Sequence, residues 1–238
     1  ISLGGDGTTL AALRLGLKYG KKVYGMNLGH LGAYQNEYNS EGLSERLEEA
    51  QEIMLYPLKV QALGIQGDII QQIAWNEVYV RSGDNPQQAR LIGSIEGDKR
   101  PFFVCGDGHL LATPMGSAAY NVSAGGHKLG FRENLWASTS IAVCRGVNDI
   151  LPASAHVRLE VVQAAKRSVS LFADNLYLGK VSSCDIFHDF SVGVPLLWDK
   201  KKIERFEQSA AQIISKRPRR VQTALTLKGC YRHAYQRS

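Results

Sequence analysis

The chain has 238 residues, of which 44% are hydrophobic and 21% are charged. This composition excludes a wholly disordered chain, and the length suits one large domain or two smaller ones. The formal net charge is +6, but residues 216–238 carry seven Lys or Arg and no acid, so the rest of the chain is nearly neutral. We therefore expect a solvated basic tail rather than a binding arm, and no nucleic-acid partner.

The cysteine content and hydropathy point to a reducing compartment without a membrane. The four cysteines are scattered singly, none in a CxxC pair, which argues against disulfides and against a metal site built by the protein. No apolar run approaches the ~18 residues needed to span a bilayer. The first residues do not resemble a signal peptide, so the predicted location is cytoplasmic.

Residues 1–56 predict a partial α/β domain. A glycine turn follows only three strand residues, and a helix then carries Leu10, Leu13 and Leu17 at helical spacing up to Gly20. A buried strand at 23–26 completes a βαβ unit, which implies parallel strands. Residues 41–54 read as a second amphipathic helix.

Residues 57–190 predict a β-rich domain with hairpin turns. One helix is expected at 117–124, and strands are expected at 58–63, 69–80, 89–96, 101–105, 157–162, 169–173 and 179–187. Residues 191–238 would form a helical segment, at 201–214, and the basic tail. The predicted fold class is therefore a partial α/β nucleotide-binding domain followed by an all-β-dominated, sandwich-like domain.

The first candidate site is the turn Gly4-Gly5-Asp6-Gly7-Thr8. Glycines let a ligand approach the backbone, and the N–H groups at the start of a helix attract phosphate. A carboxylate beside a phosphate is repulsive unless it holds a metal ion or accepts the proton of an attacking hydroxyl, and both occur in phosphoryl transfer. The alternative is a capped helix, with Asp6 or Thr8 as the cap.

The second candidate site is the stretch of small residues at 105–126, which includes Asp107, Tyr120 and Asn121. Small side chains permit a flat ligand to lie on the backbone, and the tyrosine ring offers a stacking surface. A tightly packed helix or turn without a ligand is the alternative interpretation.

A third feature is the polar pair Asn76-Glu77 at the centre of the apolar strand predicted for 69–80. Because successive strand residues face opposite sides, at least one of the pair would face the core. A buried Glu without a partner is costly, so a ligand is one explanation. An edge strand with both side chains solvated is the other.

In order and spacing, these segments resemble the NAD kinase family. The match runs from Gly4–Thr8 through Gly25–Gly32, which is similar to the family's GxNxGxLGF, to Asn76-Glu77, Gly106-Asp107-Gly108 and Ala112–Gly126. It covers roughly residues 1–200. The resemblance implies transfer of the γ-phosphoryl group of ATP to the 2′-hydroxyl of the adenosine ribose of NAD, which yields NADP.

The resemblance also implies roles for individual residues. Asp6 would accept the proton of the attacking hydroxyl, and Asp6 and Asp107 would converge across a domain cleft on one dinucleotide. Asp107 would hold the nicotinamide end, in the family often at a subunit contact. The residues lining the phosphates would be Gly4, Gly5, Gly7 and Thr8. The residues binding NAD would also include Asn76, Glu77, Arg90, Thr113, Ala118, Ala119, Tyr120, Asn121, Ser123 and Asp174.

Some positions depart from the family pattern. Ala118 removes a hydroxyl from the cradle, Ala33 replaces a Phe, and Cys105 stands where many members have an Arg. His127 replaces a Pro, and Met115 stands where Thr is common. The strands and helix that precede the glycine turn in the family are absent here, so we expect exposed apolar surface and a fragment or a divergent member.

The implied ligands are NAD and ATP, with Mg²⁺ or another divalent cation carried on ATP. Polyphosphate is an alternative donor. A homodimer or homotetramer without a membrane partner is expected. Two other functions remain open: a non-catalytic dinucleotide-binding remnant, and a diacylglycerol-type lipid kinase, since such kinases also carry GGDGT.

Overall fold

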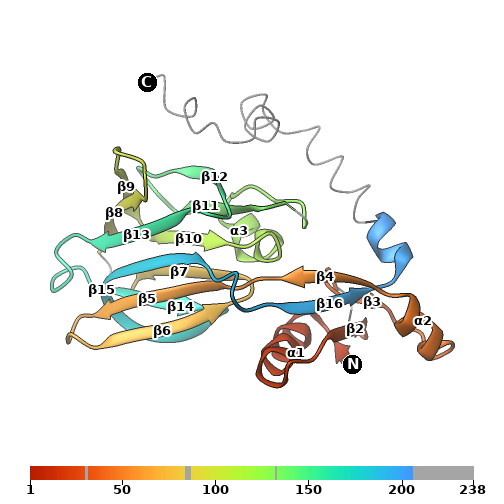
Figure 1. The fold of residues 1–238 in the computed structure, drawn as a ribbon. Coiled ribbons are helices and arrows are strands. Elements are labelled where there is room, and N and C mark those ends of the chain that lie inside the picture. Colours follow the sequence, from red (N-terminus) through yellow and green to blue (C-terminus); the bar gives the residue numbers. More distant parts are fainter. Residues whose placement is uncertain (30–31, 84–86, 132, 206–238) are drawn as a thin grey trace.

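The computed structural model describes residues 1–29, 32–83, 87–131 and 133–205, in two parts that lie side by side in Figure 1. One part is a small sheet flanked by helices, and the other is a larger β-rich body. This arrangement confirms the predicted fold class. Residues 200–205 are helical, whereas the remainder of the helix predicted for 201–214 and the basic tail lie outside the described residues.

The small sheet combines the first strands of the chain with a much later one. Its order is β1-β2-β16-β4, with β3 beside β2. β1 and β2 are parallel, as the predicted βαβ unit requires, and β16 is parallel to β2 and antiparallel to β4. Its elements are β1 (Ser2–Gly4), α1 (Asp6–Tyr19), β2 (Val23–Asn27), β3 (Asn36–Glu37), α2 (Leu43–Glu49), β4 (Gln51–Leu55) and β16 (Val194–Trp198).

Helix α1 leaves the glycine turn directly and packs on the small sheet. Asp6 lies in its first turn, where a carboxylate interacts favourably with the positive end of the helix dipole. Leu13 is fully buried. Gly20 ends the helix with a φ of 60°, which glycine adopts without strain, so the predicted stop is confirmed.

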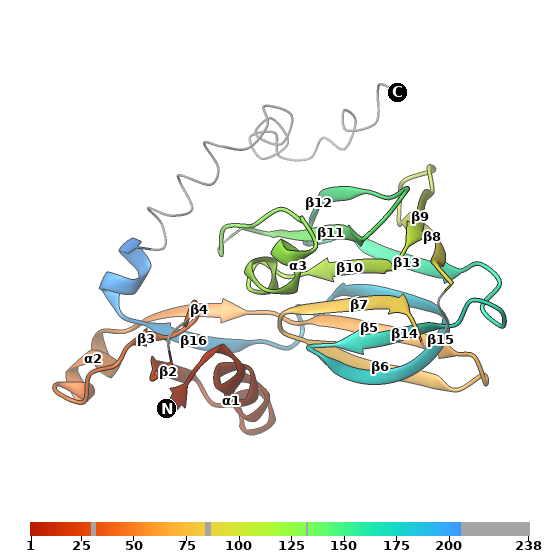
Figure 2. The ribbon, with the colours of Figure 1, turned by 180° about the vertical axis from the view of Figure 1, so that it is seen from behind.

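The β-rich body is an 11-stranded sheet that curls into two facing layers (Figures 1 and 2). Its order is β12-β11-β10-β7-β14-β15-β13-β8-β9, and β5 joins β15 to β6. The first elements are β5 (Leu58–Gly64), β6 (Ile69–Ala74), β7 (Glu77–Ser82), β8 (Ala89–Ile95), β9 (Phe102–Gly106), β10 (Gly108–Ala112), η1 (Gly116–Ala118) and α3 (Tyr120–Ser123). The later ones are β11 (Leu135–Ile141), β12 (Asn148–Pro152), β13 (His156–Val161), β14 (Val169–Ala173) and β15 (Leu176–His188).

The structure corrects several predicted elements. The helix expected over 41–54 ends at Glu49, because Ile53 and Leu55 alternate with exposed residues on strand β4. The helix expected at 117–124 is divided at Ala119 into η1 and α3. No sequence pattern predicted β16, which lies in the small sheet although it follows residue 191. The domain boundaries at 56 and 190 stay a prediction.

The two parts share a hydrophobic core. Leu13 and Trp198 from the small sheet and its helix pack in one cluster with Trp75, Met115 and Phe131 from the β-rich body. A larger cluster fills the β-rich body itself. Among the described residues, every helix is too short or too polar to span a lipid bilayer.

Leu13→Ala is expected to lower the free energy of unfolding by ~2–5 kcal/mol, because it leaves a cavity where α1 meets the small sheet. Leu15→Ala is the matched control, since Leu15 lies on the same helix and is 57% exposed. Urea unfolding followed by tryptophan fluorescence measures both. Equal losses for the two variants would contradict the packing of α1 described above.

Candidate functional site

The glycine turn between β1 and α1 is closely packed on one side and open on the other. Gly4 has a φ of 151°, and a Cβ at this residue would lie 2.3 Å from Thr8 Oγ1. A Cβ at Gly7 would meet no atom within 4 Å, so a ligand can approach the first turn of α1 there. Gly5 is the N-cap residue and no side chain caps the helix, so the interpretation of Asp6 or Thr8 as the cap is wrong.

The Asp6 carboxylate contacts the loop that follows β2. Its oxygens accept hydrogen bonds from the backbone N–H groups of Ala33 (3.2 Å) and Tyr34 (3.1 Å). The Gln35 side chain joins the same two segments by donating to the Gly5 carbonyl at 2.5 Å. The glycine turn and this loop therefore form one unit, with the half-buried Asp6 between them.

A cavity of about 390 Å³ lies beside this unit, between the small sheet and the β-rich body. Residues 32–37 line one side, and Pro114, Met115 and Ala118 line the other. Ala118 is the one predicted site residue among the described residues that line it. Three cationic side chains also line it: Lys128, Lys202 and Arg205.

Tyr34 connects Asp6 to the opposite side of the cavity. Its hydroxyl donates to the Met115 carbonyl, and its ring packs near Phe131 with 6.1 Å between centroids. Burial raises the pKa of Tyr34 above its usual range, and the carboxylates of Asp6 and Glu77 add to the rise. The phenol therefore stays protonated, and both carboxylates lie within electrostatic range of it.

The strand predicted over 69–80 is broken at Trp75 and Asn76. The Asp174 carboxylate accepts hydrogen bonds from the backbone N–H groups of Trp75 (2.9 Å) and Asn76 (2.7 Å), in place of a strand partner. Asp174 lies in the two-residue turn between β14 and β15, and Arg14 of α1 pairs with it at 3.2 Å. The expectation that the polar pair lies at the centre of a strand is therefore wrong.

The polar pair is buried at the start of β7. Glu77 is 2% exposed and Asn76 is 8% exposed, so the alternative of two solvated side chains is wrong. Glu77 Oε2 and Asn76 Oδ1 have no hydrogen-bond partner among the residues that the structure describes. Burial raises the pKa of Glu77 to about 8, and the Asp174 carboxylate adds to the rise. Two buried polar groups without partners fit a ligand that brings its own hydroxyl or amino groups.

The start of the small-residue stretch packs against the strand break. A Cβ at Gly116 would lie 2.0 Å from the Asn76 carbonyl oxygen, so this contact requires glycine. The Thr113 N–H donates to the same carbonyl at 2.9 Å. The Thr113 hydroxyl donates to the Trp75 carbonyl at 2.7 Å. The stretch and the strand break therefore hold each other in place.

The rest of the stretch is partly structural. Asn121 is fully buried, and its amide donates to the carbonyls of Ser117 (3.0 Å) and His127 (2.9 Å), so it fixes the loop. The Tyr120 ring packs edge-on against Tyr79, with 5.1 Å between centroids. The remaining predicted residues of this stretch are at least partly exposed: Ala119 and Ser123.

Asp107 and Arg90 lie away from this cluster. Asp107 is exposed between β9 and β10, at one end of β10, whereas Glu77 pairs with the residue at the other end. Arg90 is exposed on β8. The expected convergence of Asp6 and Asp107 on one cavity is therefore wrong for a single chain. The implied role of Asp107 at a subunit contact stays a prediction.

Most residues that line the cavity beside Asp6 were not predicted as site residues, and they include Tyr34 and Lys202. Tyr34 directly follows the segment that is similar to GxNxGxLGF, so its place in the chain was a usable signal. Lys202 had no signal, because it is one of three consecutive lysines and the folding of β16 into the small sheet decides which lysine faces inward.

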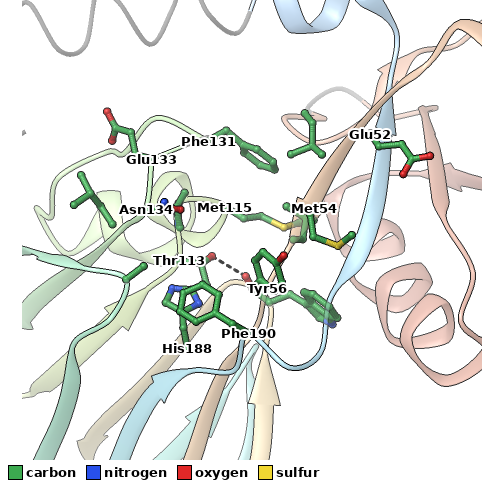
Figure 3. A pocket seen from close by; sticks show the side chains of 16 residues that line it. Glu52, Met54, Tyr56, Thr113, Met115, Phe131, Glu133, Asn134, His188 and Phe190 are labelled. Atoms are coloured by element: carbon green, nitrogen blue, oxygen red, sulfur yellow. Dashed lines mark hydrogen bonds between the residues drawn. The ribbon is translucent and has the colours of Figure 1, made fainter. Parts of the chain in front are cut away.

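A second cavity, of about 290 Å³, lies behind Met115 and Phe131 (Figure 3). Tyr56, His188 and Phe190 gather at one side of it. Burial lowers the pKa of the His188 imidazole to about 4. Thr113 is the one predicted site residue among the described residues that line this cavity. Each cavity is thus lined by one predicted site residue, and the first is the one that lies beside the loop bound to Asp6.

The relatives and the solved structures that match this chain have related names. No family model matches the chain. A protein of Hyphomonas neptunium named NAD kinase is 36% identical over 202 residues, which cover 84% of this chain and 79% of the relative. One from Cereibacter sphaeroides with the same name is 40% identical over 203 residues, with coverage of 84% and 79%.

Two solved structures have a similar fold. Yeast NADH kinase complexed with NADH matches with a TM-score of 0.74 and 22% identity, over 91% of this chain and 66% of that one. An NAD kinase from Archaeoglobus fulgidus in complex with ATP matches with a TM-score of 0.69 and 18% identity, over 88% of this chain and 81% of that one.

The raised pKa of Glu77 predicts a pH-dependent stability. The folded chain binds more protons than the unfolded chain between pH 4.5 and about 8, so the free energy of unfolding falls as pH rises through this range. Glu77→Gln has no carboxyl group to ionise, so it does not lose stability in this way. The free energy of unfolding of the variant minus that of wild type should therefore be larger at pH 8 than at pH 5. Urea unfolding at both pH values measures it.

Glu49→Gln is the control, because Glu49 is exposed on α2. Its stability relative to wild type should not change with pH in this way. A Glu77→Gln variant whose relative stability is the same at pH 5 and pH 8 would contradict the buried, protonated carboxyl.

Proposed function

The chain belongs to the NAD kinase family, and we propose that it transfers the γ-phosphoryl group of ATP to the 2′-hydroxyl of the adenosine ribose of NAD, yielding NADP. The observation that carries this proposal is the cavity beside Asp6, between the glycine turn and the small-residue stretch. Cationic side chains line it, and the Asp6 carboxylate and the accessible helix start lie beside it, which are the groups that phosphoryl transfer requires.

In this reaction the 2′-hydroxyl oxygen attacks the γ-phosphorus, the bond from that phosphorus to the oxygen of ADP breaks, and Asp6 accepts the hydroxyl proton. Two backbone N–H groups already bind the Asp6 carboxylate, which fixes its direction before a substrate arrives. Gly4, Gly5, Gly7 and Thr8 would line the phosphates at the start of α1. A divalent cation would arrive bound to the phosphates of ATP.

The dinucleotide would lie against the strand break. Asn76 Oδ1 and Glu77 Oε2 are buried polar atoms that the ribose hydroxyls and the adenine amino group would satisfy. Asp174 would act by fixing the backbone of this pair. The other residues of the proposed cradle are Thr113, Ala118, Ala119, Tyr120, Asn121 and Ser123. Arg90 is exposed on β8 and would contact NAD only from another subunit.

The remaining expectations form part of the proposal. The chain would act as a homodimer or homotetramer. It would do so in the cytoplasm, because the described cysteines are unpaired, as is usual in a reducing compartment. Polyphosphate would serve as an alternative phosphoryl donor. Neither a membrane nor a nucleic acid is required for the proposed reaction.

Asp6→Asn is expected to lower the rate of NADP formation ~10²–10⁴-fold, because the amide cannot accept the hydroxyl proton. The measurement uses ATP, Mg²⁺ and NAD, with NADP detected by an NADP-specific dehydrogenase. Asp68→Asn is the control, since Asp68 is exposed in the turn between β5 and β6 and should keep wild-type activity.

Other outcomes separate the alternatives. A wild-type chain that binds NAD without forming NADP would be a non-catalytic dinucleotide-binding remnant. Phosphorylation of diacylglycerol together with refusal of NAD would identify a lipid kinase. Equal activity of wild type and Asp6→Asn would remove Asp6 from its proposed role.

The position of Asp107 predicts complementation between two inactive variants. If Asp107 serves the site of another subunit, Asp6→Asn and Asp107→Ala chains that are unfolded and refolded together would regain up to about one quarter of wild-type activity, because half of the dimers would be mixed and each would hold one intact site. Each variant refolded alone is the control. Unchanged activity after mixing would contradict a shared site.

A further inference from the structure

Phosphoryl transfer requires positive charge near the phosphate, and the glycine turn supplies none. Residues 1–13 contain Asp6 but no Lys or Arg. Arg14, the first cation along the chain, pairs with Asp174 at the strand break. Charge that develops in the transition state is usually stabilised by fixed cations as well as by a metal ion. A fixed cationic side chain for this site must therefore come from another part of the chain.

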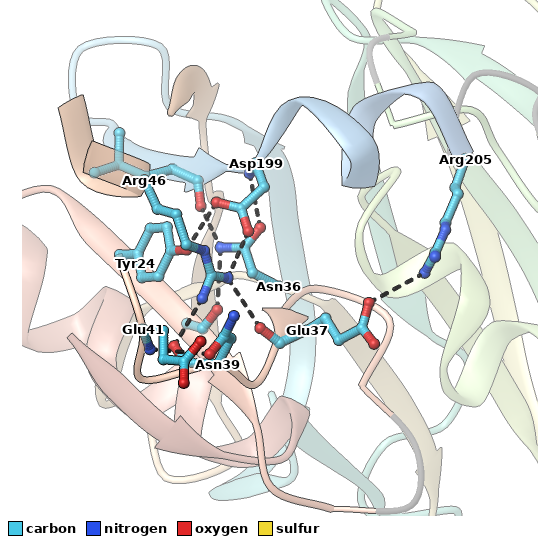
Figure 4. A network of polar contacts seen from close by, with 10 residues as sticks. Tyr24, Asn36, Glu37, Asn39, Glu41, Arg46, Asp199 and Arg205 are labelled. Atoms are coloured by element: carbon cyan, nitrogen blue, oxygen red, sulfur yellow. Dashed lines mark hydrogen bonds and ion pairs between the residues drawn. The ribbon is translucent and has the colours of Figure 1, made fainter. Parts of the chain in front are cut away.

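Three cationic side chains line the cavity, and they differ in what they face. Arg205 forms an ion pair with Glu37 at 3.7 Å (Figure 4). Lys128 lies beyond the small-residue stretch, on the side of the β-rich body. Lys202 lies on the side of the small sheet, next to the loop that holds Asp6. Lys202 is therefore the lining cation that lies next to the loop bound to Asp6.

The Lys202 ammonium has a defined position. Its Nζ lies 3.5 Å from the Gly32 carbonyl oxygen and 5.5 Å from the centre of the Trp198 ring. Burial lowers the pKa of Lys202, whereas the nearby Asp6 carboxylate raises it. The Gly32 carbonyl beside the ammonium directly precedes Ala33, whose N–H binds Asp6, so the ammonium lies next to the loop that holds this carboxylate and retains donors for a further acceptor.

The segment that carries Lys202 is anchored at Asp199, directly after β16. The Asp199 carboxylate accepts hydrogen bonds from the Tyr24 hydroxyl (2.7 Å) and from Arg46 (2.6 Å). Its N–H donates to Asn36 Oδ1 at 2.8 Å. Figure 4 shows these side chains converging on Asp199 from β2, β3 and α2.

The short helix after this anchor is fixed as well. The N–H groups of Lys202 (2.9 Å) and Ile203 (3.2 Å) donate to the Asp199 carbonyl. Ile203 is 5% exposed and packs in the core that the two parts of the chain share. Lys201, in contrast, is exposed. The fold thus selects one of three consecutive lysines to face the cavity.

We propose that Lys202 is a catalytic residue whose ammonium binds the phosphoryl group during its transfer to the hydroxyl beside Asp6. This inference rests on the proposed function, because it assigns a residue to the same reaction. The new oxygen–phosphorus bond forms as the bond to the leaving ADP oxygen breaks, and the hydroxyl proton goes to Asp6. Lys202 keeps its proton and contributes charge only.

The test compares Lys202→Met, Lys202→Arg and the matched control Lys201→Met. Lys202→Met should lower kcat for NADP formation by ~10²-fold or more, because it removes a cation from the transition state. The KM for NAD should stay within about threefold, since the dinucleotide binds mainly at the strand break. Lys202→Arg should recover part of the loss, and Lys201→Met should match wild type.

Calorimetric titration with tripolyphosphate gives a readout that does not depend on turnover. Lys202→Met should bind it at least about tenfold more weakly than wild type, whereas Lys201→Met should not. If wild type forms no NADP, the proposed function fails and this titration still decides the role of Lys202. Wild-type kcat or wild-type tripolyphosphate affinity in Lys202→Met, in a variant that melts at the wild-type temperature, would overturn the inference.

Discussion

The geometry of the site depends on the buried carboxylate of Asp174. It accepts hydrogen bonds from the backbone N–H groups of Trp75 and Asn76. These bonds separate the end of β6 from the start of β7 at Glu77. The Asn76 carbonyl thereby becomes available to Thr113, and Gly116 can pack directly on it. Without that carboxylate, two buried N–H groups would lack an acceptor, which is costly. The strand break, the small-residue stretch and the buried Glu77 therefore form one structural unit.

A second constraint joins this unit to the glycine turn. Tyr34 donates its hydroxyl to Met115 while its backbone N–H binds Asp6, so the two sides of the cavity contact each other through one residue. Trp198 donates its indole N–H to the Tyr34 carbonyl at 2.8 Å, and its ring packs on Phe131 with 4.6 Å between centroids. The surface where the small sheet meets the β-rich body is therefore apolar and aromatic, and the polar groups of the site lie at the edge of that surface.

Local signals in the sequence predicted the fold better than long-range ones. The glycine turn, α1 and its stop at Gly20 follow from neighbouring residues, and so do the β hairpins. The break at Asn76 could not be predicted, because its cause is Asp174, 98 residues later in the chain. The predicted position of Asp107 beside Asp6 was wrong for a related reason. A GDG sequence indicates a turn, but it does not indicate at which end of the sheet the turn lies. The position of Lys202 depends on the insertion of β16 into the small sheet, and no local sequence pattern predicts that insertion.

The insertion of β16 between β2 and β4 has a consequence for synthesis on the ribosome. Residues 1–55 emerge long before residues 194–198, so β2 cannot gain its central neighbour until the later segment has left the exit tunnel. Domains usually fold as units while the chain grows, but here the β-rich body can close before the sheet that precedes it is complete. Nascent chains that stall within β15 would expose the unpaired edges of β2 and β4. Such edges are bound by chaperones, and chains that expose them aggregate.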